Sequence, residues 1–198
     1  MKVCVFGAGA IGGYLAAGLA GLETAELSIV ARGAHLEAIN SAGLTLLKGD
    51  ETLVTRPRAS ADPGALGPQD VVINCLKAHQ AWESAEAMIP LLGPDTIVIT
   101  CQNGVPWWYF HKLEGRFEGR RLDSVDRDDR QWRAIGPERV IGCSVYPAAE
   151  ISAPGVVKHV YGNKFALGAP DGSTEATQSS AVAKAGDSVN RSTDRLLS

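Results

Sequence analysis

Three glycines near the start of the chain, in the segment Gly7-Ala8-Gly9-Ala10-Ile11-Gly12, have the G-x-G-x-x-G spacing of a turn that binds a dinucleotide. The first glycine of such a turn allows a tight bend, the second lets the backbone approach a pyrophosphate, and the third lets the next helix pack closely. That helix points free N–H groups and a positive dipole end at the phosphates. The alternative is a glycine-rich turn without a ligand.

Three polar side chains, Arg32, Lys77 and Asn103, follow later apolar runs and add to this chemistry. A site for NAD usually has a carboxylate where Arg32 stands, whereas the planar fork of arginine suits a 2′-phosphate, so NADP(H) is favoured. Lys77 can hold a carboxylate or phosphate as a point charge, and Asn103 offers a donor and an acceptor to a carboxamide or a small substrate. The alternatives are solvated charges for the two cations and a turn-forming role for Asn103.

The apolar pattern predicts the elements that position these residues. Near-continuous apolar runs are typical of parallel strands buried on both faces, and their alternation with helices predicts a right-handed, mostly parallel sheet. Ligands bind such sheets at the carboxyl ends of the strands, where the three polar residues are expected. The expected strands are 3–6, 27–31, 44–47, 53–55, 71–76 and 96–101, and the expected helices are 11–22, 34–42 and about 80–92.

The composition narrows the class of protein. The 198 residues carry a net charge of −3, which lacks the basic footprint of a nucleic-acid binder. The uncharged run over residues 3–22 could be a membrane span or a signal peptide, but its six glycines favour a strand, a turn and a helix. The four cysteines lie far apart and predict reduced, buried thiols in a cytoplasmic protein, with no metal site.

Several further segments have structural interpretations. His79 and His111 could titrate near neutrality, but neither has a suitably spaced Asp or Ser partner. The aromatic run 107–110 predicts a helix anchored in the core or against a neighbouring domain, not a platform for stacking bases. The mixed charges of residues 123–133 predict an exposed loop.

Four motifs together resemble one known family, the ketopantoate reductases (2-dehydropantoate 2-reductases). They are GAGAIGGYLAAGLAG at the start, Ala31-Arg32-Gly33, CLKAHQAW around Lys77, and CQNGV around Asn103. Residues 141–168 also resemble the extra strands that close the cofactor domain of that family. The resemblance covers about residues 1–172, and the pairing of the Lys77 and Asn103 motifs makes it specific.

The resemblance implies a Rossmann-type α/β fold, a doubly wound and mostly parallel sheet with extra strands on the C-terminal side. The implied reaction is the NADPH-dependent reduction of ketopantoate, a small 2-keto acid, to pantoate in pantothenate synthesis. Residues 7–12 would then cradle the pyrophosphate and Arg32 would take the 2′-phosphate. Lys77, as a supporting catalytic residue, and Asn103 would lie beside the nicotinamide and the substrate, and Ala148 would line the cofactor through its backbone.

The end of the chain departs from the family pattern. The proton-donating lysine of these enzymes lies in a second, helical domain, and residues 173–198 lack the apolar stripe that such helices need. Lys184 does not match the family's setting for that lysine. We therefore expect a cofactor domain over residues 1–172 and a weakly structured tail over 173–198, with the helical domain lost by truncation or a frameshift.

Three functions remain open at this point. The first is an NADPH-dependent ketopantoate reductase whose activity is impaired in this chain. The second is an NADP(H)-binding module without turnover, and the third is a dehydrogenase of another 2-keto acid. An apolar face left by the missing domain, with Trp107 and Trp108 in it, would favour self-association.

Overall fold

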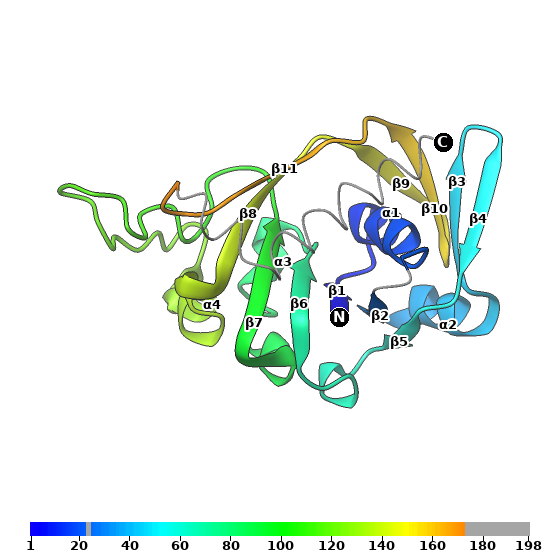
Figure 1. Cartoon of the computed structure of the whole chain (residues 1–198), viewed down its shortest axis with the longest axis horizontal. Helices are drawn as coiled ribbons and strands as arrows, with labels where there is room; N and C mark the ends of the chain where they lie inside the picture. The colour runs from blue at the N-terminus through cyan, green and yellow to red at the C-terminus, as the bar shows by residue number, and fades with distance from the viewer. Residues whose placement is uncertain (23–24, 173–198) are drawn as a thin grey trace.

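Two β-sheets enclose the first helix in the computed structural model, which describes residues 1–22 and 25–172 (Figure 1). The α-helices are α1 (Ala10–Leu19), α2 (Gly33–Ala42), α3 (Ala78–Ala81) and α4 (Arg130–Ala134). The strands are β1 (Lys2–Phe6), β2 (Glu26–Val30), β3 (Leu44–Lys48), β4 (Glu51–Thr55), β5 (Arg58–Ser60), β6 (Gln69–Asn74), β7 (Leu92–Cys101), β8 (Val140–Val145), β9 (Ala148–Ala153), β10 (Val156–Tyr161) and β11 (Phe165–Gly168).

The larger sheet has seven strands in the order β11-β8-β7-β6-β1-β2-β5. All neighbours in it are parallel except β11 and β8. From β5 to β8 this is the strand order of the doubly wound dinucleotide-binding fold, so the predicted fold class is confirmed. The order reverses direction at β1, which pairs with β2 on one side and β6 on the other. Ligands bind such sheets at this switch point.

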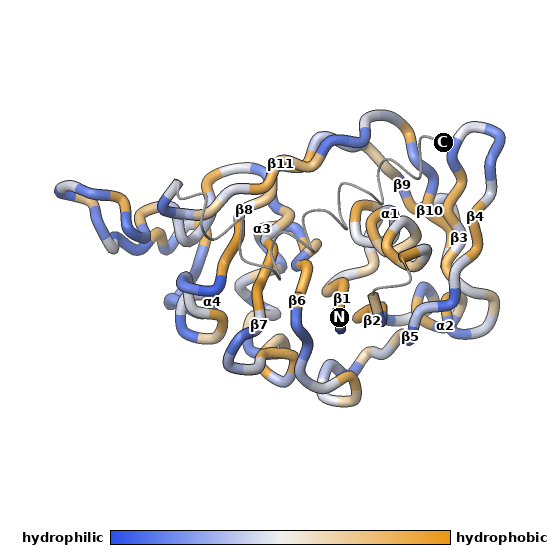
Figure 2. The backbone as a smooth tube through the Cα atoms, viewed as in Figure 1, coloured by the Kyte–Doolittle hydropathy of each residue, from blue (hydrophilic) through white to orange (hydrophobic). Residues whose placement is uncertain are grey.

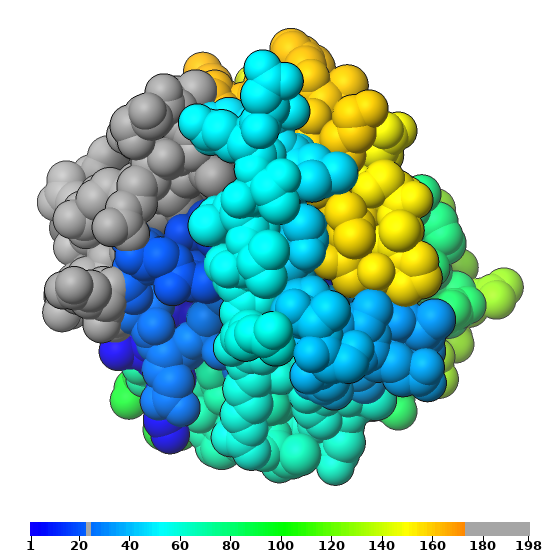
Figure 3. Space-filling view, turned by 90° about the vertical axis from the view of Figure 1, so that its right-hand side faces the viewer, coloured from blue at the N-terminus to red at the C-terminus, as the bar shows by residue number. Residues whose placement is uncertain are grey.

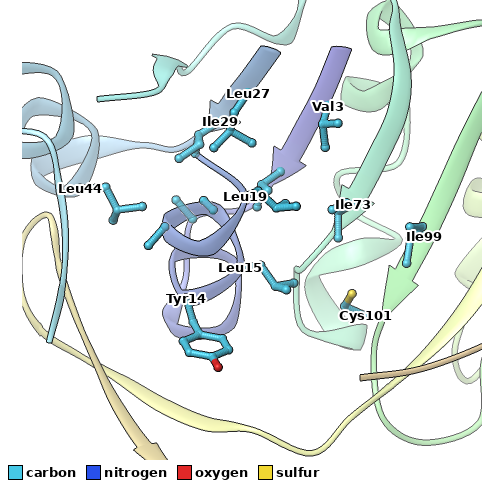
Figure 4. Packing of buried hydrophobic residues seen from close by; sticks show 14 of the residues in the cluster. Val3, Tyr14, Leu15, Leu19, Leu27, Ile29, Leu44, Ile73, Ile99 and Cys101 are labelled. Atoms are coloured by element: carbon cyan, nitrogen blue, oxygen red, sulfur yellow. The ribbon is translucent and has the colours of Figure 1, made fainter. Parts of the chain in front are cut away.

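The smaller sheet has the order β4-β3-β10-β9 and lies against the other side of α1. Helix α1 contacts β1 and β2 of the larger sheet and β3, β9 and β10 of the smaller one. Every residue from Gly12 to Leu19 is buried as a result (Figure 4). The hydrophobic side chains concentrate on α1 and on the strands of the larger sheet (Figure 2). A helix that is apolar all round is buried on every side, which explains the uncharged run of the sequence.

The expected helix over residues 80–92 is wrong. The structure has the single turn α3, further turns, and a 3₁₀ segment at Glu86–Leu91 that leads directly into β7. Pro90 lies inside that segment. A proline has no N–H to donate and its ring clashes with the preceding turn, so a regular α-helix cannot continue through this position.

The expectation of an exposed loop over residues 123–133 is also wrong in part. Asp126 and Gln131 are only 2% and 1% exposed, and α4 begins inside this segment. The Asp126 carboxylate accepts hydrogen bonds from the backbone N–H groups of Gln131 and Trp132, at 2.8 and 3.0 Å. Burial raises the pKa of Asp126, and these two hydrogen bonds oppose that rise. The carboxylate thus satisfies N–H groups at the start of α4.

The aromatic run forms turns and not the expected helix. Trp107 is 2% exposed and packs edge-on against Trp132, with ring centroids 5.9 Å apart. This tryptophan therefore belongs to the core of the chain and does not form an exposed apolar face. The following residues form the arm that projects from the body beside α4 (Figure 1).

Exposed apolar side chains lie instead on the smaller sheet and the arm. Strand β4 of the smaller sheet, in cyan, lies on the outer surface beside the yellow segment that holds β9 and β10 (Figure 3). The large hydrophobic side chains that are exposed in these parts include Leu53, Val54, Val160, Tyr161, Leu113 and Phe117.

The four cysteines are free, and three of them, Cys4, Cys101 and Cys143, are buried as expected, while Cys75 is half-buried. No helix within the described residues is long and apolar enough to cross a membrane. The expected tail over residues 173–198, with Lys184, lies outside the described residues.

Close packing of α1 gives a prediction about stability. A Cβ added at Gly13 would lie 2.6 Å from Cγ2 of Val157, in the smaller sheet. We expect Gly13→Ala to lower the free energy of unfolding by about 1–3 kcal/mol, despite the higher helix propensity of alanine. Chemical denaturation measures the change.

The double variant with Val157→Ala tests the cause. If the clash is responsible, the two single effects will add to more than the effect of the double variant. Gly168→Ala is the matched control, because a Cβ there meets nothing within 4 Å. A cost at Gly168 equal to that at Gly13, or strict additivity with Val157→Ala, would contradict the clash.

Candidate functional site

The glycine turn lies between the end of β1 and the start of α1. Gly7 has a φ of 98°, a left-handed conformation that favours glycine, and its N–H and that of Ala8 donate to the Val30 carbonyl at 3.1 and 3.2 Å. A Cβ at Gly12 would overlap the Gly7 carbonyl oxygen. The first and third glycines thus have the bend and close-packing roles predicted from the motif.

The second glycine faces open space. A Cβ at Gly9 would meet no atom within 4 Å, so the backbone there can approach a ligand closely. Gly9 is the N-cap of α1, and the first intrahelical bond runs from the Gly13 N–H to the Gly9 carbonyl at 2.7 Å. The N–H groups of Ala10, Ile11 and Gly12 precede that bond and have no intrahelical partner. This cradle fits the pyrophosphate of a dinucleotide.

A cleft of about 760 Å³ opens in front of the glycine turn. This volume is within the range of small-molecule sites. The glycine turn from Gly7 to Ile11 forms one part of its wall, and Arg32 and Lys77 belong to others. Arg32 is the exposed N-cap of α2 and Lys77 the exposed N-cap of α3, so each cation stands where a strand leads into a helix.

A second cleft of about 310 Å³ adjoins the first and shares Ile11, Cys75, Leu76 and Lys77 with it. Asn103 lies on its wall, together with other residues from the ends of β6, β7 and β8. The structure therefore brings Lys77 and Asn103 to one cleft and joins that cleft to the one that holds Arg32. This is the convergence that the strand ends predict.

The Asn103 side chain is largely engaged in holding two strand ends together. Its Nδ2 donates to the Val145 carbonyl and its Oδ1 accepts from the Val145 N–H, both at 2.9 Å. The neighbouring Gln102 likewise donates from Nε2 to the Leu76 carbonyl at 2.9 Å. These amides tie the ends of β6, β7 and β8 to one another. Asn103 retains one N–H and one lone pair for a ligand.

The charges of the two clefts have one sign. Among the described residues that line them, Arg32 and Lys77 are the charged side chains, and there is no carboxylate. Within residues 1–22 and 25–172, neither cation has a side-chain hydrogen bond or an ion pair with the protein. Two unpaired cations and the N-terminus of α1 favour an anionic ligand.

Ala148 is the first residue of β9, where it pairs with Tyr161 of β10. Its neighbour Pro147 lines the smaller cleft and its other neighbour Ala149 lines the larger one. The YPAA segment therefore lies along both clefts. The described residues contain no group of three or more His, Cys, Asp or Glu side chains placed to hold a metal ion.

Sequence analysis missed His35, which lies in the first turn of α2 and lines the larger cleft. Its Nδ1 accepts a hydrogen bond from the Gly155 N–H at 2.9 Å, so the ring ties α2 to the turn before β10. Burial lowers the pKa of His35, which keeps the ring neutral as this acceptor role requires. Its Nε2 is buried without a hydrogen-bond partner among the described residues.

Gln80 and Ser84 were also missed. They line the larger cleft after Lys77, four residues apart. The Ser84 N–H donates to the Gln80 carbonyl at 3.2 Å, so this stretch is helical locally and both side chains share a face. The spacing from Lys77 is the signal that could have found them.

With this geometry described, similarity to known proteins is decisive. The model of the ketopantoate reductase PanE/ApbA family matches residues 3–172 of this chain. The chain belongs to the ketopantoate reductase family. The resemblance drawn from the four motifs is confirmed.

Individual ketopantoate reductases agree with this membership. A curated 2-dehydropantoate 2-reductase of Mesorhizobium japonicum is 54% identical over 172 residues, which are 87% of this chain and 53% of that protein. A crystal structure assigned to the ketopantoate reductases, from Ralstonia solanacearum MolK2, is 39% identical with a TM-score of 0.87, and covers 96% of this chain and 57% of that one. The chain spans about half the length of the relatives it matches.

The His35 contact gives a prediction about pH. Because the pKa of His35 is lowered in the folded state, the unfolded chain takes up this proton first as the pH falls. The stability that the neutral ring contributes is full above the ordinary histidine pKa of about 6.5 and is lost as the pH falls below it towards the lowered value. His35→Asn keeps an acceptor for Gly155 and cannot titrate, so we expect its melting temperature to fall less between pH 7.5 and pH 5.5.

The control for this experiment is His79→Asn, since His79 is exposed on α3. Burial also lowers the pKa of His111, so some loss of stability at low pH will persist in every variant. Identical pH dependence in His35→Asn and the unmodified chain would contradict the role of His35.

Proposed function

We propose that this chain binds NADPH along the two joined clefts and that the protein it represents reduces 2-dehydropantoate to pantoate. The observation that carries this proposal is the convergence of the glycine turn, Arg32, Lys77 and Asn103 at the switch point of the sheet. Membership of the ketopantoate reductase family supports the reaction. Residues 1–172, which match the family, would form the cofactor domain.

In this proposal the N–H groups at the start of α1 bind the pyrophosphate, and Arg32 binds the 2′-phosphate through its planar fork. The absence of a carboxylate from the described lining of the cleft supports NADPH over NADH, because an Asp or Glu would be the partner of a free ribose 2′-hydroxyl. The cofactor supplies a hydride when it is bound. The smaller cleft would then hold the reacting end and the substrate.

At the substrate end, Lys77 would hold the carboxylate of the 2-keto acid as a point charge, which orients the ketone. The remaining N–H of Asn103 would donate to the substrate or to the cofactor carboxamide, while its two bonds to Val145 fix the direction of the amide. The apolar side chains of Ile11, Leu76 and Val145 on the cleft walls would exclude water from the reacting centre.

The assignment to NADPH gives a prediction about Arg32. Hydrogen bonds to charged groups contribute about 1.5–3 kcal/mol, so Arg32→Ala should weaken NADPH binding by roughly 10–100-fold and leave NADH binding nearly unchanged. Titration of each cofactor by fluorescence or calorimetry measures both affinities. Arg133→Ala is the control, since Arg133 is an exposed arginine on α4 that does not line the clefts. Equal losses for the two cofactors in Arg32→Ala would overturn the assignment.

A second candidate function is an NADP(H)-binding module without turnover. The observation that favours it is length, because the relatives named for the reaction are nearly twice as long as the segment matched here. The family resemblance also assigns the proton-donating lysine to a part that residues 3–172 do not match. Loss of a general acid typically costs 10²–10⁴-fold in rate.

An assay of the 198-residue chain decides between these functions. We expect NADPH to bind and pantoate to form from 2-dehydropantoate at a rate roughly 10²–10⁴-fold below the typical enzyme value of about 10 s⁻¹. Mass spectrometry of the product detects slow turnover. Binding without any product supports the binding module, and turnover at ordinary rates would contradict the need for a further proton donor. Activity confined to another 2-keto acid would change the substrate.

Self-association is the remaining part of the proposal. Exposed apolar side chains such as Val54, Val160 and Tyr161 on the smaller sheet support it, in place of the buried Trp107. Light scattering at high concentration tests it, and a clean monomer would sink the idea.

A further inference from the structure

Three cysteines form a row across adjacent strands of the larger sheet. Cys101 of β7 is the register partner of Cys143 of β8, and Cys75 follows Asn74, which pairs with Thr100 of β7. In-register residues of neighbouring strands point to the same face, and their strands lie about 4.8 Å apart. All three residues pack in the hydrophobic cluster on the α1 side of the sheet. The Cys101 thiol interacts with both of its neighbours.

One end of this row opens into the cofactor clefts. Cys75 lines both clefts and is half-buried, and Cys101 lines the smaller cleft at 8% exposure. Cys75 also lies against the glycine turn, because a Cβ at Gly12 would be 3.1 Å from the Cys75 Cβ. A group attached to the Cys75 sulfur would therefore enter the space that we assign to the dinucleotide.

The thiols deeper in the row are less reactive. Contact with the Cys101 thiol, together with burial, raises the pKa of Cys143. For Cys101, contact with Cys143 lowers the pKa, but contact with Cys75 and burial raise it further, so it too stays protonated. The thiolate is the nucleophile in disulfide exchange, and access to the reagent is required as well. Cys75 is thus the entry point of the row and Cys101 is its neighbour.

We propose that Cys75 and Cys101 form a dithiol modification site, which small disulfides oxidise only when no dinucleotide is bound. This proposal rests on the proposed binding of NADPH in the clefts. The Cys75 thiolate attacks one sulfur of a disulfide R–S–S–R, the R–S–S–R bond breaks, a Cys75–S–S–R bond forms, and RS⁻ leaves and takes up a proton.

The Cys101 thiol then completes the exchange. It loses its proton and attacks the Cys75 sulfur, which forms a Cys75–Cys101 disulfide and releases a second RSH. In total the two protein thiols are oxidised and R–S–S–R is reduced to two RSH. The spacing of neighbouring strands is within the Cα–Cα range of protein disulfides. The attached R group in the first step, and the altered loop before Lys77 in the second, would both exclude the cofactor.

The test uses the whole chain, bis(2-hydroxyethyl) disulfide as the probe, and mass spectrometry of tryptic peptides. Trypsin places the four cysteines in four different peptides, so each thiol is followed separately. We expect Cys75 to acquire the probe first and a Cys75–Cys101 cross-link to follow. NADPH at 100 times its Kd should slow the reaction of Cys75 about 100-fold, because only the free chain reacts. Dithiothreitol should reverse both products and restore NADPH binding.

Two variants separate the steps. Cys101→Ser should stop at the mixed disulfide on Cys75, and Cys4→Ser is the matched control, since Cys4 is buried in the cluster on the other face of the sheet. NADPH affinity is measured for each variant before and after oxidation, so every variant is its own baseline. The unmodified chain alone gives the order of reaction if a variant does not fold.

Three results would overturn the proposal. They are reaction of Cys4 or Cys143 as fast as Cys75, bound NADPH that gives no protection, and full NADPH affinity in the oxidised chain. A chain that does not bind NADPH before oxidation contradicts the proposed function instead, and the selectivity for Cys75 then judges the dithiol site by itself.

Discussion

The close approach of α1 to the strand ends is the constraint on which the rest of the structure depends. Backbone alone fits between α1 and β1 at Gly12, where a Cβ would overlap the Gly7 carbonyl, and between α1 and the smaller sheet at Gly13. The helix is therefore held on two sides, and its N-terminus is fixed at the switch point between β1 and β6. A helix displaced by even one methyl group would carry its free N–H groups away from the place where the larger cleft opens. The packing of the core and the anion site are in this sense one arrangement.

Local signals explain why much of this could be predicted from the sequence. Strands β1, β6 and β7 are buried on both faces over most of their length, so their residues form apolar runs that need no knowledge of the partner strand. The parallel order then brings the strand ends to one edge, which is why Arg32, Lys77 and Asn103 were found without coordinates. The family resemblance added what the pattern could not supply, the identity of the substrate.

What escaped prediction depends on contacts between distant residues. Strand β3 pairs with β10, so that Thr45 meets Val156, and nothing near either strand indicates the other. His35 contacts Gly155, 120 positions along the chain, and therefore looked like an ordinary helix residue. The start of α4 had a signal of its own, because Asp126 lies five residues before the N–H group of Gln131 that it satisfies. Its mixed charges concealed that signal, since a single carboxylate of many was turned inward.

The polar residues at the strand ends divide into two kinds, and the division follows from their chemistry. Gln102 and Asn103 are neutral amides with both donors and acceptors, so they can complete backbone hydrogen bonds where the sheet ends, and both do so. Arg32 and Lys77 are donors only and keep their charge in solvent, so leaving them unpaired costs little in the free protein. The amides therefore hold the loops that form the clefts, while the cations remain free for an anion. A site built in this way is rigid before the ligand arrives, and its attraction for phosphate and carboxylate is not reduced by a competing carboxylate of its own.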